Sequence, residues 1–399
     1  MKAKEKLLVC VMTSGMIKAN YDRISGVLRY VAENNLPWSL SFIPAMSSIS
    51  DHDLRLERKL RLDGLIVTSS KFKETIRSGQ LPLASHIVVM STYGDEIANL
   101  PKNAVRIVFD NAGCAHTAAD LLIKRGLEYF AYVDMPPSSI EVTASRQRGE
   151  AFKAHIEEKG FECTICSRKE VRGNWTVRLQ RLAGELAALP RPCGVMAYND
   201  ERAREVIDAC NLAGLKIPEQ IQVVGMDNDL RICESMRPRL TSIEADFVGG
   251  GMRAAELLDS LIRNGRKSMQ GDYSYGAFTV VERDTTIDVK GSARLVTAAQ
   301  KIIREKACSG ITPQDIADAL NVSRRLIEMR FREVLDVGVA ETIRAEKLKE
   351  VCRRLKETNS PIEGISYECG FETPTHLKAL FRKTYGTTMR AYRAQSQAH

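Results

Sequence analysis

The sequence of 399 residues has little that could anchor it in a membrane or lead it across one. The apolar run near its start, Leu7–Met12, is six residues long. A signal-peptide core needs about 7–15 such residues and a membrane span about 20. Hydrophobic residues still make up 44% of the chain, enough to fill the cores of two or three domains. We therefore expect a cytoplasmic protein with no membrane partner.

Patterns for catalysis and metal binding are also scarce. The sequence has no nucleophile elbow, no P-loop and no dinucleotide fingerprint. Of ten cysteines, only Cys163 and Cys166 form a C-x-x-C pair, and on a strand they would face opposite sides. The three glycines at 249–251 open a helix without a Walker lysine, which favours close helix packing over phosphate binding. The six histidines are scattered, and none neighbours a convincing acid or nucleophile: His52, His86, His116, His155, His376 and His399. We expect no enzyme activity, no metal and no cofactor.

Positive charge, in contrast, is concentrated at one end. The chain has 58 Lys and Arg against 50 Asp and Glu, a net charge of +8. From Ser292 onward there are 19 basic and 13 acidic residues, a net of +6, which leaves +2 for the first 291 residues. This asymmetry suggests an anionic partner for the last quarter of the chain, most simply nucleic acid, although a solvated basic domain would look the same.

Strand-like and helix-like stretches alternate over residues 1–289, which predicts an α/β protein with parallel, doubly wound sheets in two lobes. In the first lobe we expect strands at Lys6–Thr13, Trp38–Ile43, Asp63–Thr68 and Ile87–Met90, and helices at Tyr21–Asn34 and Asp51–Arg61. In the second lobe, roughly 113–243 plus 276–289, we expect helices at Ala115–Arg125, Arg148–Lys159, Val177–Leu189 and Glu201–Ala213. Its strands are expected at Tyr129–Val133, Phe161–Cys166, Gly194–Ala197, Ile221–Gly225 and Thr279–Val289.

Two such lobes place a cleft at the carboxyl ends of their strands. Polar residues there suit a polyhydroxylated ligand, because amide, carboxylate and guanidinium groups pair with sugar hydroxyls. An Asp or Asn at a strand end often only caps the next helix, and Asp200 is expected to do so. The ligand candidates are Thr13, Ser69 and Ser91 in the first lobe, and Arg146, Asn199 and Asp227 in the second.

After a linker at 290–293, residues 294–399 read as helical throughout. At 312–335, Thr312 and Pro313 begin one short helix, and Ser323 caps a second after a tight turn. Ile327, Phe331 and Val334 would face inward. The polar residues Arg324, Arg325, Glu328 and Arg332 would face outward. This is the pattern of a helix-turn-helix unit with a basic reading helix.

A second unit follows at 360–386. We expect Ser360 to cap its first helix with Glu363 in a capping box, and Thr373 to cap its reading helix. The reading helix would expose Thr375, His376, Lys378, Arg382 and Lys383. One long helix, Ala340–Lys356, would join the two units. Two basic helix-turn-helix units joined by a helix predict binding to double-stranded DNA.

The first 289 residues resemble the effector-binding domain of the LacI/GalR regulators. The resemblance rests on "FDNAGCAHTAADLLIKRG", "SRQRGEAF" and "VMAYNDERAREVIDACNLAGLKIPEQIQVVGMDND". In that family the matching residues Arg146, Asn199 and Asp227 reach the effector. LacI-type regulators carry their DNA-binding helices ahead of this domain, but here the first strand begins near Lys6, so we expect that task elsewhere.

The tail resembles the AraC-type DNA-binding domain over nearly its full length. The matching segments are "DIADALNVSRRLIEMRF", "IRAEKLKEV" and "ISYECGFETPTHLKALFRKTYGTTMRAYR". Ala379 stands where many members have Arg, so we expect Lys378, Arg382 and Lys383 chiefly to hold phosphate while the first unit reads bases. The combination of both domains resembles the bacterial xylose-operon regulators.

These resemblances imply a sequence-specific transcription regulator controlled by a small carbohydrate, such as a xylose-like pentose, bound between the lobes. They also imply a homodimer on its DNA operator. AraC-type proteins mostly activate, which would make RNA polymerase a partner, and repression stays open. The alternative is a solute-binding or carbohydrate-processing α/β protein whose helical tail mediates protein interaction.

Overall fold

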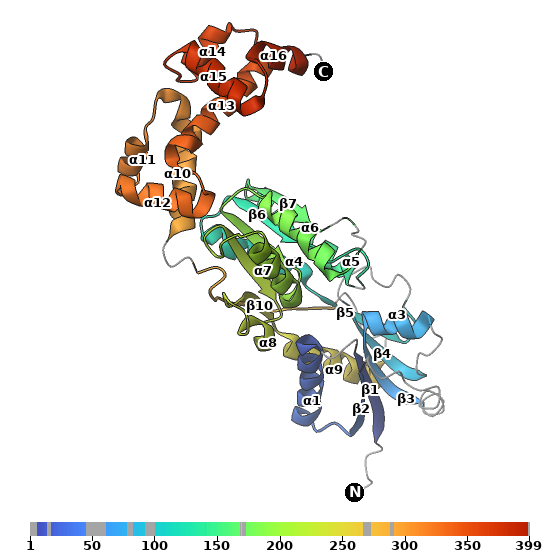
Figure 1. Cartoon of the computed structure of the whole chain (residues 1–399). Coiled ribbons are helices and arrows are strands. Elements are labelled where there is room, and N and C mark those ends of the chain that lie inside the picture. The colour runs from blue at the N-terminus through green and yellow to red at the C-terminus, as the bar shows by residue number, and fades with distance from the viewer. Residues whose placement is uncertain are drawn as a thin grey trace.

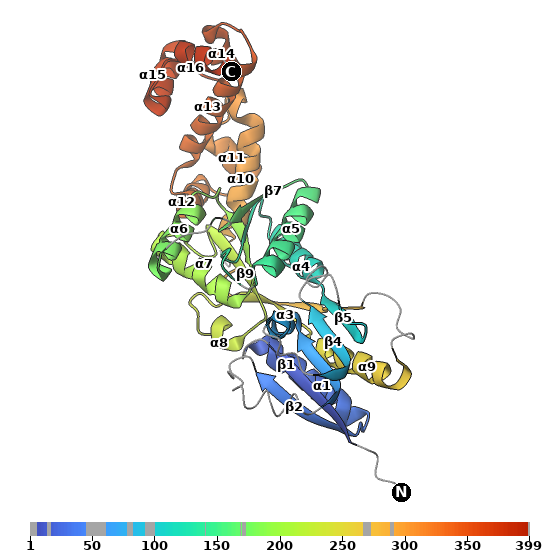
Figure 2. The same cartoon turned by 90° about the vertical axis from the view of Figure 1, so that its right-hand side faces the viewer.

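The computed structural model describes residues 6–13, 17–44, 61–77, 83–91, 100–139, 141–167, 169, 173–265, 273–287 and 291–397. The helix expected at Asp51–Arg61 lies almost entirely outside these residues. The chain forms two α/β lobes and a helical domain that stands on the second lobe, at the end of the molecule far from the N-terminus (Figures 1 and 2). None of the described helices is long and apolar enough to cross a membrane.

The first lobe is built on a six-stranded sheet in the order β11-β5-β4-β3-β1-β2. All of its paired strands run parallel. The strands are β1 (Leu7–Thr13), β2 (Trp38–Pro44), β3 (Leu62–Thr68), β4 (Ala84–Ser91), β5 (Ala104–Phe109) and β11 (Tyr273–Tyr275). Its helices are α1 (Lys18–Glu33), α3 (Ser69–Arg77) and α9 (Phe247–Asn264).

The second lobe repeats the plan with the strand order β12-β10-β9-β8-β6-β7, in which only β12 is antiparallel to its neighbour. The strands are β6 (Tyr129–Val133), β7 (Glu162–Cys166), β8 (Cys193–Ala197), β9 (Ile221–Met226), β10 (Thr241–Ala245) and β12 (Phe278–Val281). Its helices are α4 (Asn111–Lys124), α5 (Val142–Glu158), α6 (Trp175–Ala187), α7 (Asp200–Leu212) and α8 (Leu230–Cys233). The two-lobed α/β fold expected from the sequence is therefore present.

The chain passes between the lobes after β5, after β10 and between β11 and β12. At these crossings Asp110 N donates to Tyr275 O (3.0 Å) and Asp246 N donates to Ala277 O (2.9 Å). Phe109 lies beside them, with its ring 5.5 Å from Phe247 and 5.4 Å from Tyr275, measured between centroids. The crossing segments therefore share an aromatic cluster at the base of the cleft.

The glycine-rich start of α9 packs against α1. A Cβ on Gly251 would overlap the carbonyl oxygen of Arg23, and one on Gly26 would overlap that of Val248. The two helices can approach this closely only because both positions lack a side chain. Close helix packing, rather than phosphate binding, explains the glycines.

The helical domain contains two compact units joined by a long helix. Its elements are α10 (Ser292–Lys306), the short 3-10 helix η2 (Ala307–Ser309), α11 (Pro313–Ala319), α12 (Arg324–Leu335), α13 (Val339–Glu357), α14 (Ile362–Glu368), α15 (Pro374–Tyr385) and α16 (Met389–Gln397). One core gathers around Ile327, Phe331 and Val334, and the other around Leu377 and Phe381. Helix α13 contributes its first residues to the first core and its later ones to the second. The helix-turn-helix pairs α11–α12 and α14–α15 lie where the sequence predicts them.

Several boundaries differ from expectation. Helix α4 begins at Asn111, four residues before the predicted start at Ala115, and the strand expected at Thr279–Val289 ends at Val281 as β12. The linker expected at 290–293 overlaps α10, which begins at Ser292.

Helix α5 begins at Val142, six residues before the predicted start at Arg148, and its N-cap Glu141 makes no side-chain capping bond. Helix α14 begins at Ile362 with Pro361 as its N-cap, so the predicted cap at Ser360 and its capping box with Glu363 are wrong. The Ser360 carbonyl instead accepts a hydrogen bond from Arg393 (2.7 Å).

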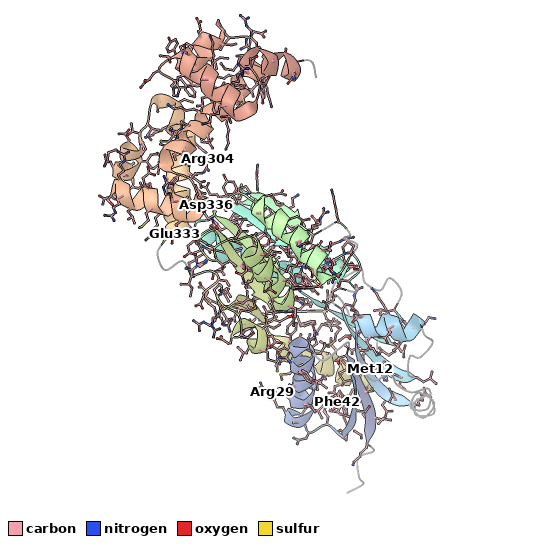
Figure 3. The ribbon with its side chains drawn as sticks, in the orientation of Figure 1. Met12, Arg29, Phe42, Arg304, Glu333 and Asp336 are labelled. Carbon is pink, nitrogen blue, oxygen red and sulfur yellow. The ribbon has the colours of Figure 1, made fainter. Side chains whose placement is uncertain are left out.

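The helical domain contacts the second lobe at the C-terminal end of α12 (Figure 3). Gln220, only 1% exposed just before β9, donates from Nε2 to Val334 O (3.0 Å) and to Asp336 Oδ2 (3.1 Å). Arg191 Nη1 donates to the same Asp336 carboxylate (3.1 Å). Because the last carbonyls of a helix carry partial negative charge, these donors hold α12 by its C-terminus.

Further contacts strengthen this junction, among them the hydrogen bonds of Gln300 Nε2 to Arg191 O (3.5 Å) and of Arg304 Nη1 to the Tyr129 hydroxyl (3.4 Å). Lys216 Nζ donates to Glu333 O (3.3 Å). Arg304 of α10 forms an ion pair with Glu128 in the second lobe. Ser292 Oγ donates to Glu333 Oε2 (3.0 Å), which ties the start of α10 to α12. The second lobe and the first helix-turn-helix unit are therefore joined by hydrogen bonds with defined partners.

Candidate functional site

A cavity of about 80 Å³ lies between the two lobes. It is several times larger than the roughly 10–15 Å³ that one water molecule needs. The strands β3, β4, β8 and β9 all end at it, as expected for the carboxyl edges of parallel sheets. The polar residues of its wall are Asn20, Arg23, Thr68, Ser69, Ser70, Glu141, Arg148, Tyr198, Asn199 and Asp227.

Arg148 is fixed by several hydrogen bonds to the protein. It is 3% exposed in the second turn of α5, and its Nη2 and Nε donate to Asn111 Oδ1 at 2.8 and 3.1 Å. Its Nη1 donates to the Tyr198 carbonyl. The guanidinium also lies over the Tyr198 ring, 4.5 Å from the centroid, and 5.7 Å from that of Phe109. Such a fixed, planar donor is suited to pairs of ligand oxygens.

Arg23 faces the cavity from α1 of the first lobe. Its Nη1 donates to Asn20 Oδ1 (2.8 Å) and its Nε to the Tyr275 hydroxyl (3.2 Å). Its guanidinium lies 4.5 Å from the centroid of the Phe247 ring. The close α1–α9 packing at Gly251 fixes the backbone that carries this side chain. Each lobe therefore supplies one buried arginine.

Asp227 follows β9 and has a left-handed backbone, with φ of 107°. Burial raises the pKa of its carboxyl group to about 8. The neighbouring carboxylates Asp200 and Glu141 also raise this pKa, whereas Arg148 and Arg23 lower it. A carboxyl group that holds its proton near neutral pH can both donate and accept a hydrogen bond. Strain and an unfavourable charge at one position are typical of a functional site.

Two more acidic groups lie near Asp227. Burial raises the pKa of Glu141 on the cavity wall. Burial also raises the pKa of Asp200 to about 6, although hydrogen bonds from Ser242 Oγ (2.6 Å) and Asp229 N (2.8 Å) lower it. Asp200 therefore organises the loop behind Asp227. The prediction that it caps α7 is wrong, because Asn199 is the N-cap.

The predicted ligand residues fall into three groups. Ser69, Asn199 and Asp227 line the cavity. Asn199 is itself the N-cap of α7, with Oδ1 accepting from Arg202 N (2.9 Å), which leaves its amide nitrogen for a ligand. Thr13 and Ser91 are buried at the ends of β1 and β4 but are not among the described residues of the wall.

Arg146 is the misplaced candidate. It is exposed on α5, whereas Arg148 two positions later faces the cavity. The error follows from the helix start, because a prediction that begins the helix at Arg148 leaves Arg146 in a loop at the cleft. The sequence does not predict three residues of the wall: Arg23, Glu141 and Arg148. The second arginine of "SRQRG" is Arg148, so this motif contains a signal for one of them.

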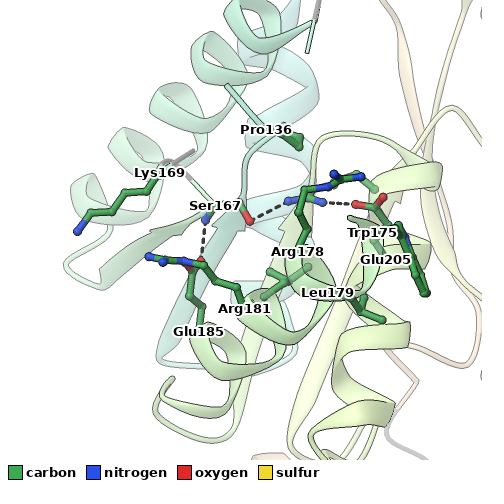
Figure 4. A pocket seen from close by; sticks show the side chains of 11 residues that line it. Pro136, Ser167, Lys169, Trp175, Arg178, Leu179, Arg181, Glu185 and Glu205 are labelled. Carbon is green, nitrogen blue, oxygen red and sulfur yellow. Dashed lines mark hydrogen bonds and ion pairs between the residues drawn. The ribbon is translucent and has the colours of Figure 1, made fainter. Parts of the chain in front are cut away.

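A second, smaller pocket of about 30 Å³ lies beside α6 and α7 in the second lobe (Figure 4). Two of its arginines pair with acidic residues of the same wall, Arg202 with Glu205 and Arg181 with Glu185. Arg202 Nη2 donates to Ser167 Oγ (2.8 Å), and Ser167 N donates to Glu185 Oε2 (2.8 Å). This network ties the end of β7 to two helices, which is a structural role. The interlobe cavity is the better ligand site because it is larger.

The helical domain exposes the side chains predicted to meet DNA. Ser323 Oγ caps α12 by accepting from Leu326 N (3.2 Å), and Arg324, Arg325 and Arg332 are exposed on that helix. Glu328 is half-buried and accepts a hydrogen bond from Val339 N (3.3 Å), so part of its carboxylate serves the start of α13.

The second reading helix has the same organisation. Thr373 Oγ1 caps α15 by accepting from His376 N (3.3 Å). The remaining candidates on this helix are exposed: Thr375, His376, Lys378, Arg382 and Lys383. A groove beside it brings Lys378, Arg382, Arg390 and Arg393 together with a single acidic residue, Glu363. The surface is positive, as phosphate binding requires.

Known protein families match both the α/β part and the helical part of the chain. Residues 119–286 match the periplasmic binding protein-like domain family, and residues 316–395 match a helix-turn-helix domain family. The xylose operon regulatory protein of Escherichia coli is 30% identical over 288 residues, 72% of this chain and 73% of that protein. The protein of the same name from Haemophilus influenzae is 27% identical over 380 residues, 94% of this chain and 95% of that protein.

Solved structures show the same architecture. One described as the xylose-binding transcription activator xylR has a TM-score of 0.60 and 24% identity, covering 98% of both chains. The lac repressor dimer bound to operator has a TM-score of 0.51 and 19% identity, covering 71% of this chain and 96% of that one. At these identities the likeness establishes the fold.

Proposed function

Because the chain belongs to the family of the xylose operon regulatory proteins, we propose that it activates transcription in response to D-xylose or a closely related pentose. It is a sugar-sensing, DNA-binding transcription regulator and not an enzyme. The observation that carries the proposal is the interlobe cavity, in which Arg23 and Arg148 oppose Glu141 and Asp227.

The hydrogen bonds of the cavity arginines favour a neutral sugar over a sugar phosphate or a sugar acid. Both arginines already donate to protein oxygens, Arg23 to Asn20 and Arg148 to Asn111. A phosphate takes several charge-assisted hydrogen bonds from such groups, and these donors are largely in use. Sugar hydroxyls can instead pair with the neutral carboxyl group of Asp227, which both donates and accepts.

The lining of the cavity supports a sugar. The cavity of about 80 Å³ adjoins a larger hollow of about 690 Å³ that shares Ile17, Glu141, Asn199 and Asp227 with it. Phe109, Tyr198 and Phe247 supply apolar faces, and Ser69, Asn199 and Asp227 supply the directional hydrogen bonds that distinguish one hydroxyl pattern from another. The sugar would bridge the lobes and favour the closed arrangement.

Activation, dimer formation and contact with RNA polymerase are the finer parts of the proposal, as is a cytoplasmic location. One solved relative is described as an activator and another as a dimer on its operator. A dimer would present four reading helices, which suits a pair of DNA half-sites.

A thermal-shift panel with D-xylose, L-arabinose, D-ribose, D-glucose and their phosphates tests the effector. A ligand at 100 times its Kd stabilises the folded state by about 2.7 kcal/mol, which raises Tm by roughly 5 °C or more for a domain of this size. We expect D-xylose or another neutral pentose to give this shift. The Arg148→Lys variant should lose it, because a lysine cannot reproduce the planar donor set.

Arg146→Lys is the matched control, since it alters the same helix two positions away and should keep the full sugar shift. A shift with phosphorylated sugars only would contradict the neutral effector. An unchanged shift in Arg148→Lys would remove this arginine from the site.

A further inference from the structure

Two cysteines of the helical domain form a pair that the regulatory function does not use. All ten cysteines lie in the described residues, and eight of them are buried. Cys163 and Cys308 are the two that solvent reaches. Cys308 lies in η2, between α10 and the first helix-turn-helix unit, and Cys369 directly follows α14 in the second unit.

The backbone brings the two residues together. A Cβ on Gly370, next to Cys369, would lie 2.5 Å from the Cys308 carbonyl oxygen and 3.3 Å from the Cys308 Cα. Although Cys308 precedes the first unit in sequence, its side chain packs against the core of the second, in which Cys369 is fully buried. A disulfide needs the Cα atoms of its two cysteines about 4.4–6.8 Å apart, and the close approach of the two backbones at Gly370 brings Cys308 and Cys369 into the same neighbourhood.

The surroundings make one of the thiols reactive. The hydrogen bond from Cys369 lowers the pKa of the Cys308 thiol to about 7, against the effects of burial and of Glu350. Lys347 and Arg354 also lower this pKa, and Lys347 Nζ is held nearby by donating to Gly370 O (2.7 Å). In contrast, burial raises the pKa of the other accessible thiol, Cys163, to about 12. Thiolates react with oxidants and thiols do not.

We propose that Cys308 and Cys369 are a reversible disulfide site in the DNA-reading domain, oxidised by a peroxide. The Cys308 thiolate attacks one peroxide oxygen, the O–O bond breaks, and the leaving oxygen takes up a proton as water. The resulting sulfenic acid is attacked by Cys369 Sγ, so that the S–S bond forms and the S–O bond breaks. The departing hydroxide takes the Cys369 proton as a second water. Two thiols are thereby oxidised while one hydrogen peroxide is reduced to two waters.

The bond would join the two halves of the DNA-reading domain. Cys308 is attached through η2 to the unit that contains α12, and Cys369 lies between α14 and α15. Helix α13 is the covalent path between the units along the chain. A second covalent link would fix α12 and α15 relative to each other. It closes a loop of about 60 residues, so it also stabilises the domain against unfolding.

The experiment treats the full-length protein with a small excess of hydrogen peroxide, followed by dithiothreitol. Free thiols are counted after denaturation, and non-reduced tryptic peptides are identified by mass. We expect the loss of two thiols, one cross-linked pair of peptides that contains Cys308 and Cys369, and recovery of both thiols with dithiothreitol. Thermal unfolding of the helical domain should shift upward by at least ~5 °C on oxidation.

Three variants make the result specific. Cys308→Ser should lose the cross-link and the thermal shift, and Cys163→Ser, the matched control at the other accessible thiol, should keep both. Cys369→Ala repeats the first test at the buried partner, with helix content from circular dichroism showing that the domain is folded. A cross-link that persists in Cys308→Ser would overturn the proposal. So would oxidation of Cys308 to sulfinic acid without any cross-linked peptide.

Discussion

Asp227 combines a left-handed backbone with a carboxyl group whose pKa is raised to about 8 by burial. An aspartate in an unfolded chain has a pKa near 3.9. Between these values the folded state binds a proton that the unfolded state releases, so the stability of the protein falls as pH rises from about 4 to 8. Asp227 therefore lowers the free energy of unfolding at neutral pH. We expect its retention to reflect a role in ligand binding.

Replacing Asp227 by Asn removes the ionisable group and keeps its shape. We expect the variant and the parent to have nearly the same Tm at pH 4.5. At pH 9 the variant should be more stable by on the order of 5 °C, because only the parent carries the buried charge. Asp227→Ala, which removes the hydrogen-bonding group as well, should lose the sugar-induced shift at both pH values. Differential scanning calorimetry across this range measures both effects.

Asp229 provides a control of opposite sign two residues away. A hydrogen bond from Arg231 lowers its pKa, so its charge stabilises the folded state above its unfolded pKa. Asp229→Asn should therefore lower Tm at pH 7 and have less effect as pH falls below about 4. If Asp227→Asn instead lowered Tm at pH 9, the raised pKa of Asp227 would be contradicted.

At the scale of elements, the two reading helices are predicted to differ in their task. Arg324 is in the first turn of α12, where a reading helix contacts base edges, and Arg382 is near the end of α15 beside the positive groove. Arg324→Ala should weaken binding to a selected duplex by about 1–3 kcal/mol and hardly affect an unrelated duplex. Arg382→Ala should weaken binding to both duplexes and reduce the slope of log K against log salt by about 1.

Fluorescence anisotropy at several salt concentrations separates these outcomes, with a duplex obtained by selection from random DNA. Lys159→Ala, which removes an exposed cation from the second lobe, should leave both affinities unchanged. Equal losses on both duplexes for Arg324→Ala would show that this arginine holds phosphate and does not read bases.

The sequence predicts elements well where local chemistry marks their ends. Ser323 and Thr373 cap α12 and α15, Pro374 begins α15 and Gly386 ends it, so both reading helices are found almost to the residue. Helix α5 has no such mark, because Glu141 makes no capping bond, and the sequence predicts its start six residues too late. That local error moved the predicted cavity arginine from Arg148 to Arg146.

The cavity itself depends on contacts that no local pattern encodes. Arg23 and Arg148 are 125 positions apart, and they meet only because the lobes pack face to face. Arg23 is oriented by Tyr275 across a separation of 252 residues. Asn199 and Asp227 could be predicted because each follows a strongly apolar strand, whose carboxyl end is a general location for ligand sites.

Across the whole molecule, one strand links the sugar cavity with the DNA-reading domain. Strand β9 connects Gln220, which precedes it and holds the end of α12, with Asp227, which follows it in the cavity. This path is roughly 23 Å long at the usual rise per residue of a strand. A shift of the strand when sugar binds would reach α12 through two hydrogen bonds. We therefore expect the contact of Gln220 with Asp336 to carry the sugar signal.

Gln220→Glu tests this path with almost no change of shape. The new carboxylate can still accept from Lys216 N, as Gln220 Oε1 does at 2.8 Å, but it loses the donor to Val334 O and repels Asp336. We expect the variant to bind sugar and DNA, each measured alone, within about threefold of the parent. The effect of sugar on DNA affinity should fall from the usual 5–150-fold of an allosteric coupling to less than about 2-fold.

Adding Asp336→Asn to Gln220→Glu should restore the coupling, because the new amide can donate to the new carboxylate. Asn also tolerates the left-handed backbone of position 336, where φ is 59°. The double-mutant cycle therefore separates loss of this contact from general damage to the junction. Normal sugar dependence in Gln220→Glu would place the signal elsewhere, for example in the ion pair of Arg304 with Glu128. Failure of Asp336→Asn to rescue it would show that the Val334 carbonyl, and not the Asp336 carboxylate, is the partner that transmits the sugar signal.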